Sequence, residues 1–317
     1  MNPYLAPERV RAALRTLGLQ PTRGMGQNFL IDGSVLAQII VAAALDAGDL
    51  VVEVGPGLGV LTWELLRHVR QVVAVELDKR LAARLSVEFA SYRTLRIIQG
   101  DILRLSPAQL LEGTPPAHLA PVAPGTLDQT SQTPSIPTPP PYKVVANLPY
   151  AITSAVLRHF LEGQPQPTSM VLLVQWEVAQ RITAPAGDLS VLAHAVQLYA
   201  APQIVARVPA CSFFPRPAVD SAILRLQIYN APAVAVNDID ALFRVIKAGF
   251  LQPRKKLANA LPTGLAAMGQ PVDRSMVIAA LTAAGVSPDQ RSETVTLAEW
   301  ASIYQALQAA GYYDRTN

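Results

Sequence analysis

The 317-residue sequence is poor in cysteine, histidine, aromatic and charged residues. Its single cysteine, Cys211, excludes a disulfide within the chain. Its four histidines lie too far apart for metal-ligand spacing, so we expect no metal site. Lysine and arginine outnumber aspartate and glutamate by only 26 to 23, and this balance does not by itself indicate a nucleic-acid partner. Hydrophobic residues make up 50% of the chain, which excludes wholesale disorder.

Signals for export or membrane insertion are also missing. Residues 1–15 carry Glu8 and three arginines, without the apolar core of a secretory signal. The most apolar helical stretch, residues 35–45, reaches about half of the roughly 20 residues that span a bilayer. Together with the low cysteine content, these features predict a cytoplasmic protein without membrane contact, and we expect a monomer.

Patterns of buried strands and amphipathic helices alternate from residue 32 onward. Strands are predicted at 50–54, 72–75, 95–98, 143–146, 170–175 and 220–227, and helices at 34–47, 60–69, 77–90 and 154–161. Strands that alternate with helices predict an α/β fold, in which helices cover both faces of a parallel sheet.

Proline interrupts this alternation after the third strand. Residues 114–141 hold nine prolines and one charged side chain, Asp128. This composition predicts a flexible surface insertion, 106–142 at its widest, inside a first domain of residues 1–228. A small all-helical domain is predicted for residues 237–317, from helical spacing at 241–250, 256–261, 274–284 and 297–309.

A glycine-rich turn, Gly55-Pro-Gly57-Leu-Gly59, joins the first predicted strand to the next helix. Glycines let backbone amides approach a ligand, and a helix start offers unpaired N–H donors, so the turn predicts a nucleotide-like ligand. A dinucleotide fingerprint would need a third glycine where Val60 stands. Acidic Glu53, just before the turn, suits a cationic ligand such as the amino group or sulfonium of S-adenosylmethionine.

Acidic residues also close the next two predicted strands. Glu76 is placed to accept hydrogen bonds from both ribose hydroxyls, and Asp101 to accept one from an adenine amino group. Each acid taken alone is better explained as an ordinary cap between strand and loop. However, three successive parallel strands end in Glu53 with Gly55, in Glu76 and in Asp101, and the carboxyl edge of an open α/β sheet is where ligands bind.

The motif Asn147-Leu-Pro-Tyr150 follows the strand predicted at 143–146. An exocyclic amine on a base is a poor nucleophile, and a site can help it by accepting its hydrogens as the nitrogen becomes tetrahedral. The Asn147 side-chain oxygen and the Leu148 carbonyl are suitable acceptors, and Tyr150 offers a ring on which an extruded base can stack. The same residues also fit an Asn-x-Pro turn beside a core aromatic, and the motif alone leaves both open.

Six motifs occur in order between residues 23 and 227. They are Gly26-Gln-Asn28-Phe-Leu30, Glu53-Val-Gly-Pro-Gly-Leu-Gly-Val-Leu-Thr62, Glu76-Leu-Asp78, Gly100-Asp-Ile-Leu103, Asn147-Leu-Pro-Tyr150 and Phe213-Phe-Pro-Arg-Pro-Ala-Val-Asp-Ser221. Together they resemble the KsgA (RsmA) family of ribosomal RNA adenine dimethyltransferases. The resemblance implies a class I methyltransferase (Rossmann-like) fold and S-adenosylmethionine as the cofactor. It further implies dimethylation of N6 on two adjacent adenosines in a hairpin near the 3′ end of small-subunit (16S) ribosomal RNA, during ribosome biogenesis.

The resemblance, with the glycine turn and its acid, predicts the site residue by residue. The cofactor site would comprise Asn28, Leu30, Glu53, Gly55, Gly57, Glu76, Asp101, Ile102 and Asn147. Asn147, Leu148 and Tyr150 would hold the target adenine, and Phe213 would form the opposite wall of the base pocket. Phe213 is equally typical of a core residue before a turn.

A weaker continuation of the resemblance, residues 250–259, supplies candidates for RNA contact. Arg254, Lys255 and Lys256 can meet phosphates, although a run of three cations is more often a solvated helix face. Pro253 stands where the family pattern has a further basic residue. The expected partner is small-subunit ribosomal RNA or a pre-ribosomal particle.

Three other functions stay open. One is an adenine N6-methyltransferase that acts on large-subunit RNA and confers antibiotic resistance. Another is a non-catalytic RNA-binding assembly factor, which the intact Gly55 turn and Asn147 disfavour. The third is a nicotinamide-dependent oxidoreductase, which Val60 and Glu53 disfavour.

Overall fold

The computed structural model describes residues 2–18, 28–114 and 139–312. Contacts divide the chain into two compact units, Met1–Trp176 with Gln203–Ile228 and Glu177–Pro202 with Tyr229–Asn317. The sequence-based division assigned residues 177–202 to the first domain, whereas here they group with the C-terminal helices. That residues 1–228 and 237–317 form two separate domains therefore stays a prediction.

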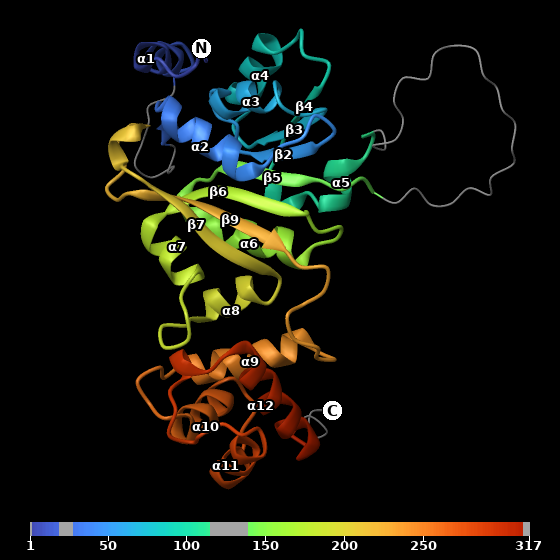
Figure 1. Cartoon of the computed structure of the whole chain (residues 1–317), viewed down its shortest axis with the longest axis vertical. Coiled ribbons are helices and arrows are strands. Elements are labelled where there is room, and N and C mark those ends of the chain that lie inside the picture. The colour runs from blue at the N-terminus through green and yellow to red at the C-terminus, as the bar shows by residue number, and fades with distance from the viewer. Residues whose placement is uncertain (1, 19–27, 115–138, 313–317) are drawn as a thin grey trace, which may run out of the picture. The chain divides into compact units, whose positions relative to one another are not determined.

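The sheet that dominates the first unit has seven strands in the order β4-β3-β2-β5-β6-β9-β7 (Figure 1). Strands β4, β3, β2, β5 and β6 run parallel to one another, whereas β9 pairs antiparallel with β6. Helices flank this sheet, so the predicted α/β fold is confirmed. The strands are β2 (Leu50–Val54), β3 (Gln71–Glu76), β4 (Leu95–Gln99), β5 (Lys143–Asn147), β6 (Ser169–Gln175), β7 (Ala200–Val208) and β9 (Ser221–Ile228).

A second, two-stranded sheet pairs β1 (Phe29–Leu30) with β8 (Phe213–Phe214). It holds together two segments that are far apart in the sequence, in the register Phe29↔Phe214 and Leu30↔Phe213. The helices of this unit are α1 (Pro7–Thr16), α2 (Gly33–Ala43), α3 (Val60–Leu65), α4 (Lys79–Glu88), α5 (Pro107–Leu111) and α6 (Thr153–Glu162).

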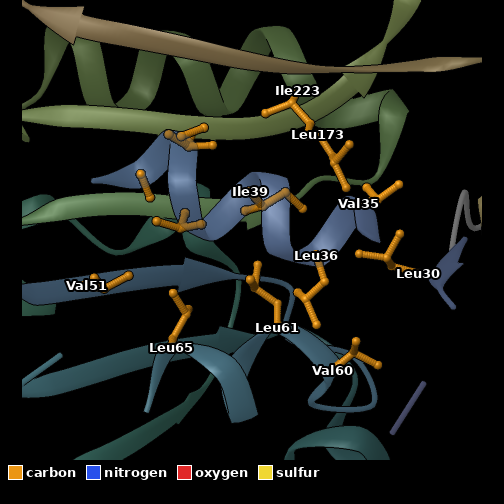
Figure 2. Close-up of a cluster of buried hydrophobic side chains, with 14 of the residues drawn as sticks. Leu30, Val35, Leu36, Ile39, Val51, Val60, Leu61, Leu65, Leu173 and Ile223 are labelled. Atoms are coloured by element: carbon orange, nitrogen blue, oxygen red, sulfur yellow. The ribbon is translucent and has the colours of Figure 1, made fainter. Parts of the chain in front are cut away.

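One hydrophobic cluster ties α2 and α3 to the sheet. Figure 2 shows Leu36 and Ile39 of α2 between Leu61 of α3 and the strand residues Leu173 and Ile223. Helix α2 starts where the Asp32 carboxylate accepts the Ser34 N–H at 2.9 Å, which caps its first turn. The packing fixes the strand ends that carry the predicted site.

The order of the parallel strands reverses between β2 and β5. From β2 the chain proceeds outward through β3 to β4, whereas β5 lies on the other side of β2 and leads to β6. In open α/β sheets a crevice forms at such a reversal, outside the carboxyl ends of the strands. Gly55 directly follows β2 and Asn147 ends β5, so the fold brings their two motifs to the same crevice.

The second unit is helical. All four helices predicted for residues 237–317 are present, and α10 continues past its predicted end through Pro262 to Ala267. Leu261 and Leu265 of α10 are fully buried, which explains why the helix tolerates a proline that lacks an N–H donor. The helices are α7 (Trp176–Ile182), which starts at the last residue of the first unit, α8 (Val191–Gln197), α9 (Ile239–Phe250), α10 (Leu257–Ala267), α11 (Arg274–Ala283) and α12 (Leu297–Ala309).

The predicted insertion, 106–142, is structured at both ends. Helix α5 begins with a capping box between Ser106 and Gln109, and Pro107 occupies its first turn, where a proline is well tolerated. At the other end Tyr142 is buried, and its hydroxyl donates to the Pro165 carbonyl at 2.8 Å. Residues 115–138, which hold most of the prolines, lie outside the described residues.

Helices α9 and α10 approach each other most closely at Gly264. A Cβ at this position would fall on the Ala248 carbonyl of α9. We therefore predict that Gly264→Ala lowers the free energy of unfolding by about 2 kcal/mol, measured by urea denaturation. Gly48→Ala, at an exposed turn with room for a Cβ, is the control and should change it by less than about 1 kcal/mol. Equal effects of the two changes would contradict the close packing.

Candidate active site

A cavity lies at the carboxyl edge of the sheet, where the strand order reverses and where ligands of open α/β folds bind. The ends of β1, β2, β3 and β5 contribute to its lining. Predicted site residues that line it are Asn28, Leu30, Glu53, Gly55, Gly57, Glu76, Asn147, Leu148 and Tyr150.

Glycine shapes the turn that follows β2. Gly57 and Gly59 have φ of 59° and 85°, in the left-handed region that favours glycine. A Cβ at Gly59 would lie 2.7 Å from the Phe89 ring, so a larger residue would displace the start of α3. Gly55 and Gly57 line the cavity without side chains, but the N–H groups of all three glycines are already donated within the fold, to Val75, Glu76 and Pro56.

Glu53 is an acid inside a strand whose other residues are buried and apolar. Its side chain is 1% exposed, and the Thr62 hydroxyl donates to it at 2.7 Å. Burial raises the pKa of Glu53 to about 8, and the nearby Glu76 adds to the rise, while the Thr62 hydrogen bond opposes it. A cation in the cavity would favour the ionised carboxylate, because opposite charges lower the pKa of an acid.

Glu76 ends β3 on the cavity wall. One carboxylate oxygen accepts the Gly57 N–H at 3.0 Å, and the other accepts the Asp78 N–H at 2.9 Å. Burial raises its pKa, and the two backbone hydrogen bonds oppose the rise. Each oxygen keeps a further lone pair, so Glu76 can accept hydroxyl groups from a ligand while it holds the glycine turn.

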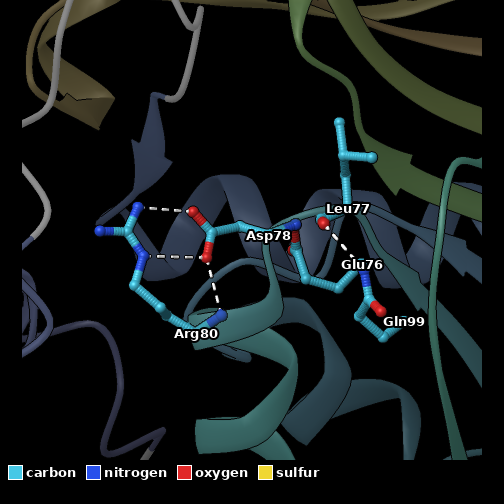
Figure 3. Close-up of polar contacts among 5 residues, drawn as sticks. All are labelled: Glu76, Leu77, Asp78, Arg80 and Gln99. Carbon is cyan, nitrogen blue, oxygen red and sulfur yellow. Dashed lines mark hydrogen bonds and ion pairs between the residues drawn. The ribbon is translucent and has the colours of Figure 1, made fainter.

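The turn after Glu76 is held by its own polar contacts (Figure 3). Asp78 accepts the Arg80 N–H and pairs with its guanidinium, both at 2.8 Å, and Gln99 of β4 donates to the Leu77 carbonyl at 3.3 Å. The Leu77 side chain is 67% exposed and offers an apolar surface beside Glu76. Leu77 was not among the predicted site residues, and it does not line the cavity described above.

Asn147 is oriented by a hydrogen bond to the backbone of another motif. Its Nδ2 donates to the Asn28 carbonyl at 3.0 Å. Because a carbonyl only accepts, the amide must turn its nitrogen towards Asn28, which leaves the amide oxygen as the acceptor for an incoming N–H group. Next to it, the Leu148 N–H donates to the Leu173 carbonyl at 3.3 Å, and half-buried Tyr150 begins a single 3₁₀ turn, Tyr150–Ile152.

Three predicted site residues of the first unit do not line the cavity in the part of the chain that the structure describes. Asp101 and Ile102 follow β4 beside Glu76, and Asp101 caps the turn Ile102–Arg104 by accepting the Leu103 N–H at 3.0 Å. Phe213 is buried at 3% exposure in the core cluster. Their roles in the site stay predictions.

The predicted RNA contacts lie in the second unit, between α9 and α10. Arg254, Lys255 and Lys256 are all exposed, and Lys256 pairs with Asp289 at 2.9 Å. Gly26 and Gln27, which open the first motif, lie outside the described residues.

Residues 2–18, 28–114 and 139–312 contain neither a candidate metal cluster nor a candidate membrane span. In these ranges no group of three or more His, Cys, Asp or Glu side chains could hold a metal ion. No helix there is long and apolar enough to cross a membrane. The cytoplasmic location and the monomeric state stay predictions.

The sequence of the chain matches a known protein family over most of its length. The family model described as ribosomal RNA adenine dimethylase matches residues 20–308. The chain belongs to the ribosomal RNA adenine dimethylase family. This membership confirms the predicted resemblance and the predicted methyltransferase activity, and it sets aside the nicotinamide-dependent oxidoreductase.

Curated relatives match over nearly their whole length. The ribosomal RNA small subunit methyltransferase A of Dehalococcoides mccartyi (strain ATCC BAA-2266) is 43% identical over 283 residues, which cover 89% of this chain and 87% of that protein. The protein of the same name from Moorella thermoacetica is 39% identical over 310 residues, which cover 97% of this chain and 100% of that protein.

Solved structures agree on the fold of this family member. The 23S rRNA methyltransferase ErmE has a TM-score of 0.62 and 27% identity, with 89% of this chain and 100% of that chain covered. A dimethyladenosine transferase from Plasmodium falciparum has a TM-score of 0.68 and 22% identity, with 89% and 98% covered, and shows the fold alone. The predicted methyltransferase fold is confirmed, and the family implies S-adenosylmethionine as the methyl donor.

The burial of Glu53 in this dimethylase predicts a pH-dependent stability. Its pKa of about 8 in the folded protein exceeds its usual value of 4.5, so the folded state keeps a proton that the unfolded state loses between these values. The contribution of Glu53 to stability therefore falls as pH rises through this window. Glu53→Gln removes this effect.

We expect the stability of Glu53→Gln, relative to the unaltered protein, to rise by about 3 kcal/mol from about pH 6 to about pH 9. Urea denaturation at each pH measures it. Thr62→Val, which removes the hydroxyl but keeps the acid, should keep the decline of stability with pH. A pH-independent difference for Glu53→Gln would show that Glu53 is ionised in the folded protein.

Proposed function

We propose that this protein dimethylates N6 of two adjacent adenosines in a hairpin near the 3′ end of small-subunit ribosomal RNA, with S-adenosylmethionine as the donor. The observation that carries the proposal is the Asn147 amide, which is oriented by Asn28 and lines the same cavity as the glycine turn and its acids. Relatives named small subunit methyltransferase A support the choice of RNA.

The residues of the cavity fit a cationic nucleoside. A fully buried acid, Glu53, suits a positive charge, and Glu76 suits ribose hydroxyls because both of its oxygens already accept hydrogen bonds and can accept more. Exposed Leu77 would pack against the adenine ring of the donor, with Asp101 and Ile102 near its amino group. When bound, S-adenosylmethionine supplies an electrophilic methyl group on a cationic sulfur.

The chain itself positions the target base. The Asn147 oxygen and the Leu148 carbonyl accept the two N–H groups of the amine, which favours the tetrahedral nitrogen that attacks a methyl group. The Tyr150 ring stacks on the extruded adenine. Phe213 is proposed as the opposite wall, a role that requires its ring to leave the core cluster. The methylated nitrogen loses its proton to water, so no general base is required.

Nucleoside analysis tests the proposed substrate. Isolated small and large ribosomal subunits are each incubated with the protein and labelled methyl donor, and the RNA nucleosides are identified by mass spectrometry. We expect labelled N6,N6-dimethyladenosine in small-subunit RNA. Label in the large subunit alone would indicate the antibiotic-resistance type, and no label in either would indicate a non-catalytic assembly factor.

Asn147→Ala tests the acceptor role. Loss of an acceptor that acts in the transition state should lower the single-turnover rate of methyl transfer by roughly 100-fold or more, with RNA affinity unchanged. Gln305→Ala removes an amide from an exposed position of α12 and serves as the control. A variant that transfers methyl groups at the unaltered rate would show that the site is misplaced.

The exposed cations before α10 generate a salt-dependent prediction. The double change Arg254→Ala and Lys255→Ala should weaken RNA binding and reduce the slope of log affinity against log salt by about 2, because each cation that meets a phosphate releases a counterion. Lys256→Ala should have a smaller effect, since Lys256 already pairs with Asp289. Fluorescence anisotropy at several salt concentrations measures both, and an unchanged slope would exclude RNA contact by the first two residues.

A further inference from the structure

Ser221 contacts the base-stacking tyrosine from a distant part of the sequence. Its Oγ lies 2.7 Å from the Tyr150 hydroxyl, although 71 positions separate the two residues. Ser221 is fully buried at the start of β9, where it pairs in register with Gln175 of β6. A central strand therefore presents the serine hydroxyl to Tyr150.

Asp220, the residue before it, holds the start of β9 in place from several sides. Its carboxylate accepts the Ala210 N–H at 3.0 Å and the Arg207 Nε–H at 2.9 Å. Its carbonyl accepts the Trp176 N–H at 3.0 Å, and the Arg207 guanidinium lies over the Trp176 ring, 4.9 Å from the centroid. Ser221 thus sits on a support that does not depend on Tyr150.

Tyr150, in contrast, sits on one 3₁₀ turn after Pro149. The turn is closed by two backbone hydrogen bonds, from the Ile152 N–H to the Pro149 carbonyl at 3.1 Å and from the Thr153 N–H to the Tyr150 carbonyl, and both hold its backbone and not its ring. The ring is half-buried on the cavity wall, where fewer neighbours restrict its rotation than in the core. A hydrogen bond at the far end of the ring therefore fixes the position of the ring, and such preorganisation speeds reactions that depend on positioning.

We propose that Ser221 is a positioning residue for methyl transfer, which holds the Tyr150 ring so that the stacked adenine meets the acceptors of Asn147 and Leu148. The inference rests on the proposed function. Ser221 touches neither base nor donor, so its hydroxyl affects the rate of transfer and leaves the affinity for the donor unchanged.

Ser221→Ala tests the inference in the full chain with small-subunit RNA. We expect the single-turnover rate to fall roughly three- to tenfold, the effect of one neutral hydrogen bond, with the affinity for S-adenosylmethionine within about twofold of the unaltered protein by calorimetry. The control is Ser169→Ala, a buried serine at the opposite end of the β6–β9 pairing, which should transfer methyl groups at the unaltered rate.

A double-mutant cycle with Tyr150→Phe shows whether Ser221 acts through the tyrosine. The double variant should be no slower than Tyr150→Phe alone. The inference would be overturned if the double variant lost rate by the product of the two single effects, or if either single variant kept the unaltered rate. If Ser221→Ala does not fold, the rate of Tyr150→Phe alone tests the inference. Failure of the unaltered protein to methylate either subunit would instead refute the proposed function.

Discussion

The hydrogen bond from the Asn147 amide to the Asn28 carbonyl fixes which atom of that amide would meet the amine in the proposed reaction. It depends on two features of the fold: β5 must end at the reversal of strand order, and the segment around Asn28 must lie beside that end. The pairing of β1 with β8 supplies the second condition, because it anchors Phe29 and Leu30 next to the cavity. The proposed acceptor side chain is thus oriented by a backbone group from another motif.

Burying acidic side chains in the cavity wall lowers the stability of the fold. Glu53 occupies a position in β2 where every other residue is buried and apolar, and its raised pKa reflects the loss of water around its carboxyl group. Thr62 offsets part of this cost with one hydrogen bond. A local violation of the buried-strand pattern is expected at functional sites, where a ligand of opposite charge compensates for it.

Much of this fold was predictable, because the parallel strands are continuous apolar runs. The bounds of β2 match the prediction, β4 and β6 each differ by one residue at one end, and β3 is one residue longer at both ends. Helices α7 and α8 and strand β7 were not predicted. The two helices have only seven residues each, fewer than the roughly 11 to 18 over which helical periodicity is recognised. Strand β7 alternates between exposed and covered residues and has no continuous apolar run. Helix α5 was not predicted either, because the proline at its start resembles a helix breaker in the sequence.

The sequence predicted that Glu53, Glu76 and Asn147 lie together, because each stands at or near the carboxyl end of a parallel strand, and all three line one cavity. The roles of the Asn28 carbonyl and the Ser221 hydroxyl depend on tertiary contacts across more than 70 positions, and no local pattern encodes them. The burial of Phe213 is likewise a property of packing against α2 and its neighbours.

A crystal structure of the protein soaked with S-adenosylmethionine tests the central claim most directly. The account predicts the donor over the ends of β2, β3 and β5, with its positive charge near Glu53, its ribose at Glu76 and its methyl group facing the Asn147 oxygen. Binding of the donor anywhere else on the chain, or an Asn147 amide that has left the Asn28 carbonyl, would contradict it.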